Sequence, residues 1–107
     1  MEKNNLARFR GMLGFAMRAG KVLIGTDRVI SALPDRGEKA VRLVLLAADA
    51  SEATKKKLNF KCEFYKKEII VTPLGGEELG KLLGKLYVPA VVAITDDRFA
   101  EELKKSI

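Results

Sequence analysis

A nearly unbroken apolar run at residues 41–48, interrupted only by Arg42, constrains the fold more than any other stretch. Its valine and leucine content favours a β-strand, and the lack of alternation with polar residues is typical of a strand covered on both faces. The run therefore predicts a central strand in a sheet that carries helices on each side.

Segments with helical spacing alternate with short apolar runs along the rest of the chain. The predicted strands are residues 21–24, 41–48, 69–72 and 91–94, and the predicted helices are residues 4–20, 26–33, 52–65, 79–86 and a last helix from residue 97. Such alternation predicts an α/β fold, a three-layer α-β-α sandwich with a central four-stranded mixed sheet. Gly80 and Gly84 lower the helix propensity of the fourth helix, which indicates a close packing contact there.

A glycine turn joins the first predicted strand to its helix. Gly25 can adopt backbone angles closed to other residues, and Thr26 or Asp27 can cap the helix that follows. The free N–H groups of a helix start favour an anion, which in a basic protein indicates a phosphate. An ordinary capped turn is the alternative interpretation.

The third predicted helix is the most basic segment of the chain. Asp49 or Ser51 can cap it. Six lysines lie within this helix or directly after it, and these are Lys55, Lys56, Lys57, Lys61, Lys66 and Lys67. These charges form either a solvated helix face or a surface for nucleic acid.

Composition narrows the function classes. The 107 residues, 48% of them hydrophobic, are expected to form one domain over residues 1–107, and a net charge of +6 favours a polyanionic partner such as RNA or DNA. Histidine is absent and Cys62 is the only cysteine, which argues against Ser-His catalysis, a metal site and an internal disulfide. With no leader and no long apolar span, we expect a cytoplasmic protein with no cofactor, no metal and no membrane partner.

Two enzyme classes share parts of this pattern. Asp49, Asp96 and Asp97 follow strands as in phospho-receiver domains, but a receiver needs an acidic pair where Gly25 and Thr26 stand. Residues 75–80 (Gly-Gly-Glu-Glu-Leu-Gly) have the wrong spacing for a dinucleotide loop, and the glutamates would repel a pyrophosphate. We therefore expect no catalytic residue and no enzyme.

Four short motifs occur in a characteristic order. Residues 20–28 match Gly-Lys-x-x-x-Gly-Thr-Asn-Glu except at the last two positions, residues 47–50 match Ala-x-Asp-Ala, residues 79–84 match Leu-Gly-x-x-x-Gly, and Val-Pro stands at 88–89. Over almost the whole chain this order resembles the L7Ae/L30e superfamily of ribosomal proteins, whose members commonly bind kink-turn RNA. The long first helix and the lysine-rich third helix look most like its bacterial YlxQ-like branch.

The resemblance implies RNA binding by the turn at residues 25–28 and by the apolar loop at residues 86–88, side by side at one rim of the sheet. Asp27 replaces the family's asparagine and lacks its amide donor. Arg28 replaces the family's glutamate and offers donors that suit a guanine edge or a phosphate. Tyr87 can stack on a base, unless residues 86–88 instead bridge into the core. The implied RNA-binding residues are Arg18, Lys21, Gly25, Thr26, Asp27, Arg28, Ser31, Ser51, Lys55, Leu86, Tyr87 and Val88.

The first functional hypothesis is a monomeric, non-catalytic protein that binds structured RNA, kink-turn-like or ribosomal, with ribosome-associated proteins as further partners. The alternative is a protein-binding adaptor of the translation machinery that keeps the fold with little specific RNA affinity. An RNA binder loses affinity steeply as salt rises, because phosphate contacts release counterions, and an adaptor does not bind RNA specifically at any salt.

Overall fold

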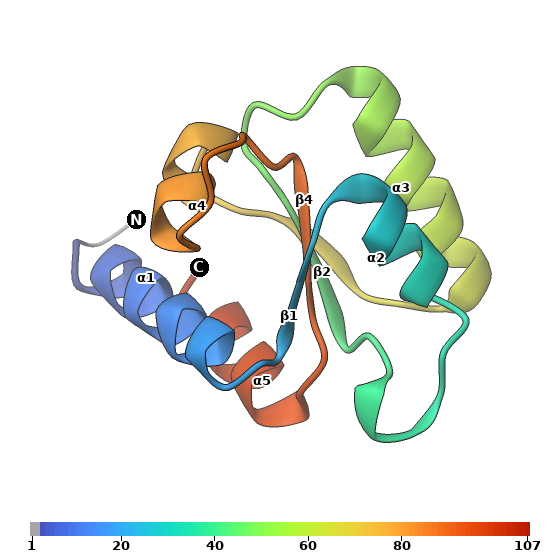
Figure 1. The fold of residues 1–107 in the computed structure, drawn as a ribbon, viewed down its shortest axis with the longest axis horizontal. Helices are drawn as coiled ribbons and strands as arrows, with labels where there is room; N and C mark the ends of the chain where they lie inside the picture. The colour runs from blue at the N-terminus through green and yellow to red at the C-terminus, as the bar shows by residue number, and fades with distance from the viewer. Residues whose placement is uncertain (1–2) are drawn as a thin grey trace.

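The computed structural model describes residues 3–107 (Figure 1). Its α-helices are α1 (Lys3–Arg18), α2 (Thr26–Ala32), α3 (Glu52–Tyr65), α4 (Gly76–Leu82) and α5 (Asp97–Lys105), with one 3-10 turn at Gly37–Lys39. The strands are β1 (Val22–Ile24), β2 (Leu43–Leu46), β3 (Ile69–Val71) and β4 (Val91–Ile94). The predicted alternation of helices and strands is therefore confirmed.

The four strands form one mixed sheet in the order β1-β4-β2-β3. β4 runs antiparallel to both neighbours, pairing Ile24 with Val92 on one side and Leu46 with Val91 on the other. β2 and β3 are parallel. β2 and β4 occupy the centre, which explains why both strands are apolar throughout and fully buried.

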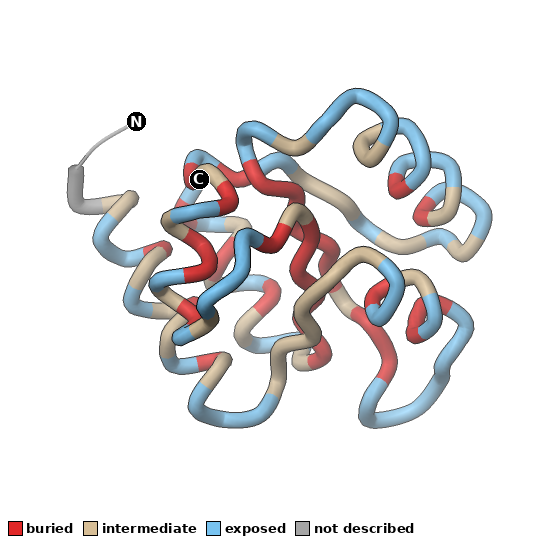
Figure 2. Tube along the Cα trace, turned by 45° about the horizontal axis from the view of Figure 1, so that its top comes forward, coloured by how far each residue is buried: buried red, intermediate tan, exposed pale blue. Residues whose placement is uncertain are grey.

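Helices cover both faces of the sheet, so the three-layer α-β-α sandwich predicted from the sequence is confirmed (Figure 1). Alternate residues of β2 point to opposite faces: Leu43 and Leu45 pack with α1, α4 and α5, whereas Val44 and Leu46 pack with α2 and α3. The sheet thus separates two hydrophobic clusters. Figure 2 shows the buried residues gathered along the sheet and the inner sides of the helices.

The fourth helix differs from its prediction. α4 ends at Leu82, and Leu86, which fits the helical spacing of the preceding leucines, lies outside it and is fully exposed. Gly84 adopts a φ of 71°, an angle that favours glycine and breaks the helix, so its role is in the backbone turn. The packing contact predicted for both glycines is found at Gly80, as described below.

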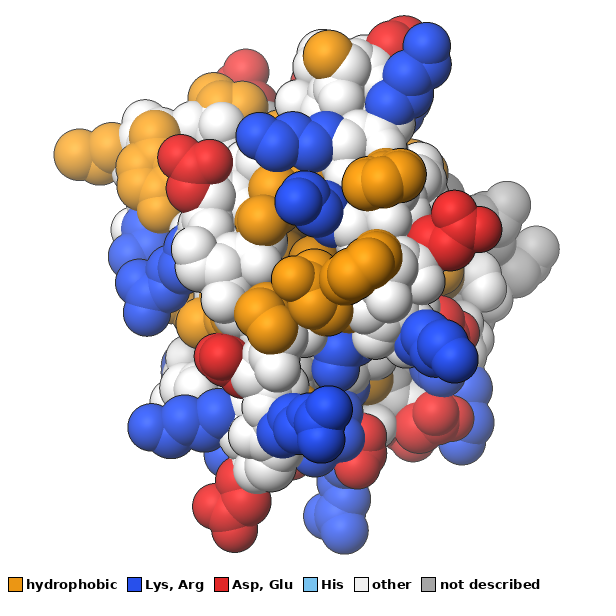
Figure 3. All heavy atoms as spheres, turned by 90° about the vertical axis from the view of Figure 1, so that its right-hand side faces the viewer, with side chains coloured by type: hydrophobic (Ala, Val, Ile, Leu, Met, Phe, Trp, Pro, Cys, Tyr) orange, Lys and Arg blue, Asp and Glu red, His pale blue; other side chains and the backbone are white. Residues whose placement is uncertain are grey.

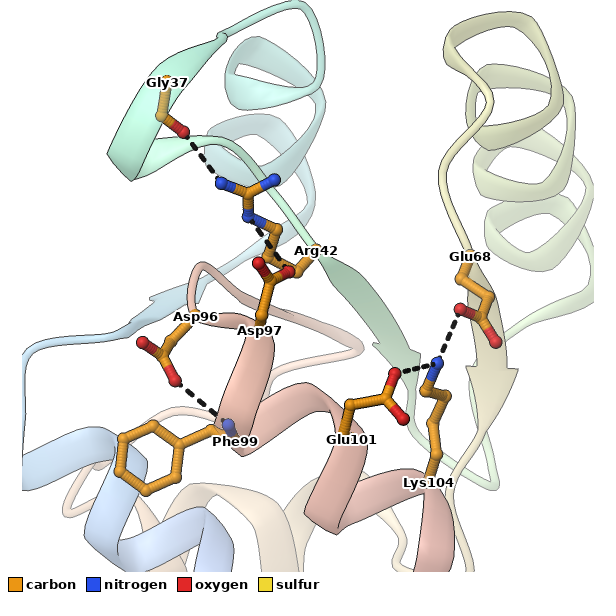
Figure 4. Close-up of polar contacts among 8 residues, drawn as sticks. All are labelled: Gly37, Arg42, Glu68, Asp96, Asp97, Phe99, Glu101 and Lys104. Atoms are coloured by element: carbon orange, nitrogen blue, oxygen red, sulfur yellow. Dashed lines mark hydrogen bonds and ion pairs between the residues drawn. The ribbon is translucent and has the colours of Figure 1, made fainter.

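Polar contacts fasten the end of the sheet where β4 leads into α5 (Figure 4). The Asp96 carboxylate caps α5 by accepting a hydrogen bond of 3.0 Å from the Phe99 N–H. Arg42 donates to the Gly37 carbonyl at 3.0 Å and pairs with Asp97 at 3.4 Å. None of these side-chain contacts lies at the opposite end of the sheet, where β4 begins.

Candidate nucleic-acid interface

The turn after β1 is built around the backbone of Gly25. Gly25 has φ 110° and ψ 144°, a region that is almost exclusive to glycine, although a β-carbon there would meet no atom within 4 Å. Its N–H donates to the Val91 carbonyl at 2.9 Å, and its carbonyl accepts from the Val29 N–H at 3.0 Å. Glycine is required here by conformation and not by space.

The predicted cap of α2 by Thr26 or Asp27 is wrong. Gly25 itself occupies the N-cap position, and no side chain caps the helix. Asp27 and Arg28 are both exposed in the first turn of α2, and neither forms an ion pair with any side chain of residues 5–107. Their charged groups are available to a ligand.

The apolar loop at residues 86–88 does not bridge into the core. Leu86 is fully exposed, and Tyr87 and Val88 are 53% and 65% exposed. Three consecutive exposed apolar side chains are uncommon on a protein surface unless they meet a partner. Pro89, directly after them, is buried and fixes the point where the loop enters β4.

Two glycines of α4 hold this loop from beneath. A β-carbon at Gly80 would lie 2.6 Å from the Tyr87 carbonyl oxygen, and one at Gly76 would lie 2.6 Å from Cγ1 of Val88 and 2.7 Å from the Pro89 carbonyl oxygen. No real β-carbon tolerates such distances. The backbone of the loop therefore rests directly on the backbone of α4, and both glycines determine where Leu86, Tyr87 and Val88 point.

Asp49 joins the end of β2 to the start of α4, the helix on which this loop rests. Its Oδ1 accepts a hydrogen bond of 2.9 Å from the Gly76 N–H at the start of α4, where a negative charge is favourable. The cap of α3 is Ser51 alone, whose hydroxyl oxygen accepts from the Thr54 N–H at 3.2 Å. Of the two caps proposed for α3, Ser51 is confirmed, and Asp49 serves α4 instead.

Three segments far apart in sequence converge at one end of the sheet. Gly25 follows β1 and is bonded to Val91, and the Ala47 N–H after β2 donates to the Ala90 carbonyl at 2.9 Å. Figure 1 shows the turn after β1, the start of α3 and the entry into β4 at the same end. We call this end the rim: residues 25–28, residues 47–51 and residues 86–90.

Eight of the twelve predicted site residues lie on the rim, and four do not. The eight are Gly25, Thr26, Asp27, Arg28, Ser51, Leu86, Tyr87 and Val88. Lys55 lies next to the rim, in the first turn of α3. Lys55 is 3.9 Å from Glu52. Lys21 and Ser31 line a groove of about 470 Å³ beside β1, which also contains Arg28 and Lys39. Arg18, at the end of α1, packs its guanidinium over the Phe15 ring and lies outside both.

Sequence reasoning missed Gly76 and Lys39. Gly76 was considered within the rejected dinucleotide loop at residues 75–80, although glycines at 76, 80 and 84, spaced four apart, could have indicated a close approach to the helix. Lys39 comes from the turn before β2 and had no signal beyond its charge.

Among residues 3–107, no three His, Cys, Asp or Glu side chains gather in a way that could hold a metal ion. Within that same range no helix has the length and apolar character needed to cross a membrane.

Comparison with protein families identifies the chain. The model of the Ribosomal protein L7Ae/L30e/S12e/Gadd45 family matches residues 7–104. The chain belongs to this family. An RNA-binding protein YlxQ of Enterococcus faecium is 37% identical over 108 residues, covering 100% of this chain and 98% of the relative. A second, from Bacillus subtilis (strain 168), is 41% identical over 95 residues, covering 86% and 87%. The predicted YlxQ-like branch is confirmed, and neither name describes an enzyme.

Two solved structures share the fold of this chain. A protein of unknown function from Bacillus halodurans C superimposes with a TM-score of 0.82 at 34% identity, covering 94% of this chain and 96% of that one. A 15.5kD RNA binding protein of Giardia lamblia gives a TM-score of 0.72 at 15% identity, covering 99% and 87%. At that identity the second likeness concerns the fold alone.

Proposed function

We propose that this protein binds structured RNA, kink-turn-like or ribosomal, through the rim. The observation that carries the proposal is that the Gly25 turn and the exposed apolar loop at residues 86–88 lie at the same end of the sheet. A buried loop, or a loop at the other end of the sheet, would have ruled the proposal out. Relatives that cover nearly all of this chain are named as RNA-binding proteins, which supports the same ligand class.

The rim combines two kinds of contact that RNA recognition needs. Arg28 carries a fork of donors that suits guanine O6 and N7 or a phosphate, and Lys55 adds a second cation on the neighbouring helix. Leu86, Tyr87 and Val88 offer an apolar surface to a splayed nucleotide, and the Tyr87 ring can stack on its base. The polar groups of Arg28 and Lys55 and the apolar surface of residues 86–88 thus lie at the same end of the sheet (Figure 1).

The groove beside β1 extends the basic surface. Lys21, Arg28 and Lys39 line it, and phosphate contacts of this kind position a nucleic acid without reading its sequence. Asp35 and Glu38 line the groove too, so its charge is mixed. We therefore assign base contacts to the rim and a supporting phosphate contact to Lys21.

The test compares single substitutions in binding to a structured RNA that contains a kink-turn. Arg28→Ala and Tyr87→Ala are each expected to weaken binding roughly tenfold or more, because a good base contact or a base stack is worth about 1–3 kcal/mol. Arg98→Ala, an exposed arginine at the start of α5 at the other end of the sheet, and Phe15→Ala, an exposed ring on α1, are the matched controls.

Two outcomes would contradict the proposal. If Arg28→Ala and Tyr87→Ala bind like the parent, the assigned surface is wrong. If the parent binds RNA weakly and without preference at both low and high salt, the adaptor hypothesis replaces RNA binding, because specific phosphate contacts make affinity fall steeply with salt.

A further inference from the structure

Two phenylalanines stand on the outer face of α3 with no role in either hydrophobic cluster. Phe60 and Phe64 are 67% and 70% exposed, and neither contributes to the residues packed on the sheet, which in α3 are Leu58 and Cys62. One helical turn apart, they lie on the same face of the helix. Figure 3 views the side that carries α2 and α3 and shows hydrophobic side chains gathered at its centre.

The rings are held in place by their surroundings. The Tyr65 ring meets that of Phe64 edge to face, with centroids 4.9 Å apart and an interplanar angle of 84°. Phe60 forms one wall of a shallow hollow of about 440 Å³ whose other walls are Asn59, Glu63, Lys67 and Ile69. A flat base placed in this hollow would contact a ring and an aliphatic side chain, with its phosphates on the side of Lys67 and away from Glu63.

Positive charges outnumber negative charges around the rings. Of the six lysines between residues 55 and 67, only Lys55 pairs with an acidic side chain, and the other five make no ion pair with residues 3–107. Glu52 and Glu63 are the acidic residues of α3. Exposed aromatic rings among unpaired lysines match a strand of nucleic acid, which carries flat bases on a chain of phosphates.

The position of this face links it to the rim. α3 begins at the rim with Ser51 as its cap, and at about 1.5 Å per residue Phe60 and Phe64 lie roughly 14 and 20 Å along the helix. A stacked strand advances about 3.4 Å per nucleotide, so about six nucleotides leaving an RNA bound at the rim reach both rings.

We propose that the outer face of α3 binds a single-stranded RNA segment that flanks the structured RNA at the rim, stacking its bases on Phe60 and Phe64. The inference deepens the proposed function, since it adds a second contact to the same RNA. Lys56, Lys57 and Lys67 contact the phosphates. The preferred RNA is therefore a folded element with an unpaired tail, and not a closed hairpin.

The experiment measures binding of three RNAs: a kink-turn stem, the same stem with six adenosines at its 5′ or 3′ end, and a free twelve-adenosine strand. A tail at one of the two ends is expected to tighten binding of the parent at least tenfold, as a base-aromatic stack provides. In Phe60→Ala/Phe64→Ala the gain from the tail is expected to fall at least tenfold, because the base stacks are lost and only the lysine contacts with the phosphates remain. Phe15→Ala, a matched exposed ring on α1, is expected to keep the full gain.

Salt provides an independent readout of the lysines. Each neutralised phosphate of a single strand contributes about −0.7 to the slope of log affinity against log salt, so three lysines make the slope for the tailed stem steeper by about 2. Lys56→Gln/Lys57→Gln/Lys67→Gln is expected to abolish that extra slope and to leave the slope for the untailed stem unchanged.

Several results overturn the inference, and they differ from a failure of the proposed function. If the untailed stem binds normally and neither tail adds affinity, the inference is wrong and an acidic protein segment becomes the occupant of this face. A tail effect that is undiminished in Phe60→Ala/Phe64→Ala also overturns it. If instead the stem fails to bind while the free strand binds and loses affinity in that double variant, the rim proposal is wrong and the α3 site stands.

Discussion

Replacing Gly80 with alanine tests whether the loop at residues 86–88 really rests on α4. In a helix interior this change normally stabilises by about 1 kcal/mol, because alanine has the higher helix propensity. Here the new β-carbon would lie 2.6 Å from the Tyr87 carbonyl oxygen and 3.2 Å from Cδ of Pro89. Both neighbours belong to a backbone that is pinned on either side, so they cannot yield freely.

The matched control is Gly11→Ala in α1, where the added β-carbon meets nothing within 4 Å. The gain in helix propensity is common to both variants, so the difference between them isolates the contact with the loop. Forcing an extra methyl group into a closed contact costs about 1–3 kcal/mol. We expect Gly11→Ala to raise the free energy of unfolding by up to about 1 kcal/mol. The free energy of unfolding of Gly80→Ala is expected to lie about 1–3 kcal/mol below that of Gly11→Ala.

Urea unfolding of the parent and both variants measures this difference, and the RNA titration described above measures its consequence. Because relief of the clash moves the Tyr87 carbonyl, Gly80→Ala is also expected to weaken binding to the kink-turn stem, whereas Gly11→Ala leaves it unchanged. Equal stabilisation by both alanines, with RNA affinity preserved in each, would show that the loop is not seated on the helix as described.

Two further predictions concern charge. Asp27→Asn combined with Arg28→Glu restores the pair that the family carries, and a gel-shift comparison is expected to show higher affinity for a standard kink-turn; no gain would contradict the transfer of roles onto these positions. Burial raises the pKa of the Cys62 thiol from its ordinary 9.0 to about 11. As pH rises from 9 to 11 the unfolded chain loses this proton first, so the free energy of unfolding should fall by about 2–3 kcal/mol. Cys62→Ala should remove this fall in unfolding curves measured between pH 9 and 11. The same fall in both proteins would refute the prediction.

The fold was predictable because each strand has a strong local signature. The run at residues 41–48 indicated burial on both faces, and β2 is indeed central and buried throughout. The strand order was not predictable, because it depends on pairings between distant segments, such as Leu46 with Val91. The end of α4 was mispredicted because Leu86 continues a helical spacing that Gly84 interrupts. Periodicity indicates which residues can share a face, and not where the backbone turns.

The rim was predictable from the resemblance, but its construction was not. The bond between Asp49 and Gly76 spans 27 residues, and the contact of Gly80 with Tyr87 depends on a loop that folds back on its own helix. Neither is written in a local pattern. Arg18 was named among the RNA-binding residues that the resemblance implies, yet β1 lies between Arg18 and Gly25 and places them at its opposite ends.

The sheet keeps both hydrophobic clusters away from the exposed side chains at its edge. Neither cluster contains Asp27, Arg28, Leu86 or Tyr87, so substitutions at these positions leave the hydrophobic core that stabilises the fold unchanged. Under the proposed function, substitutions at these positions change which RNA the rim binds while the fold stays the same, provided that the glycines under the loop are retained. A protein built in this way can diversify its ligand by surface substitution alone.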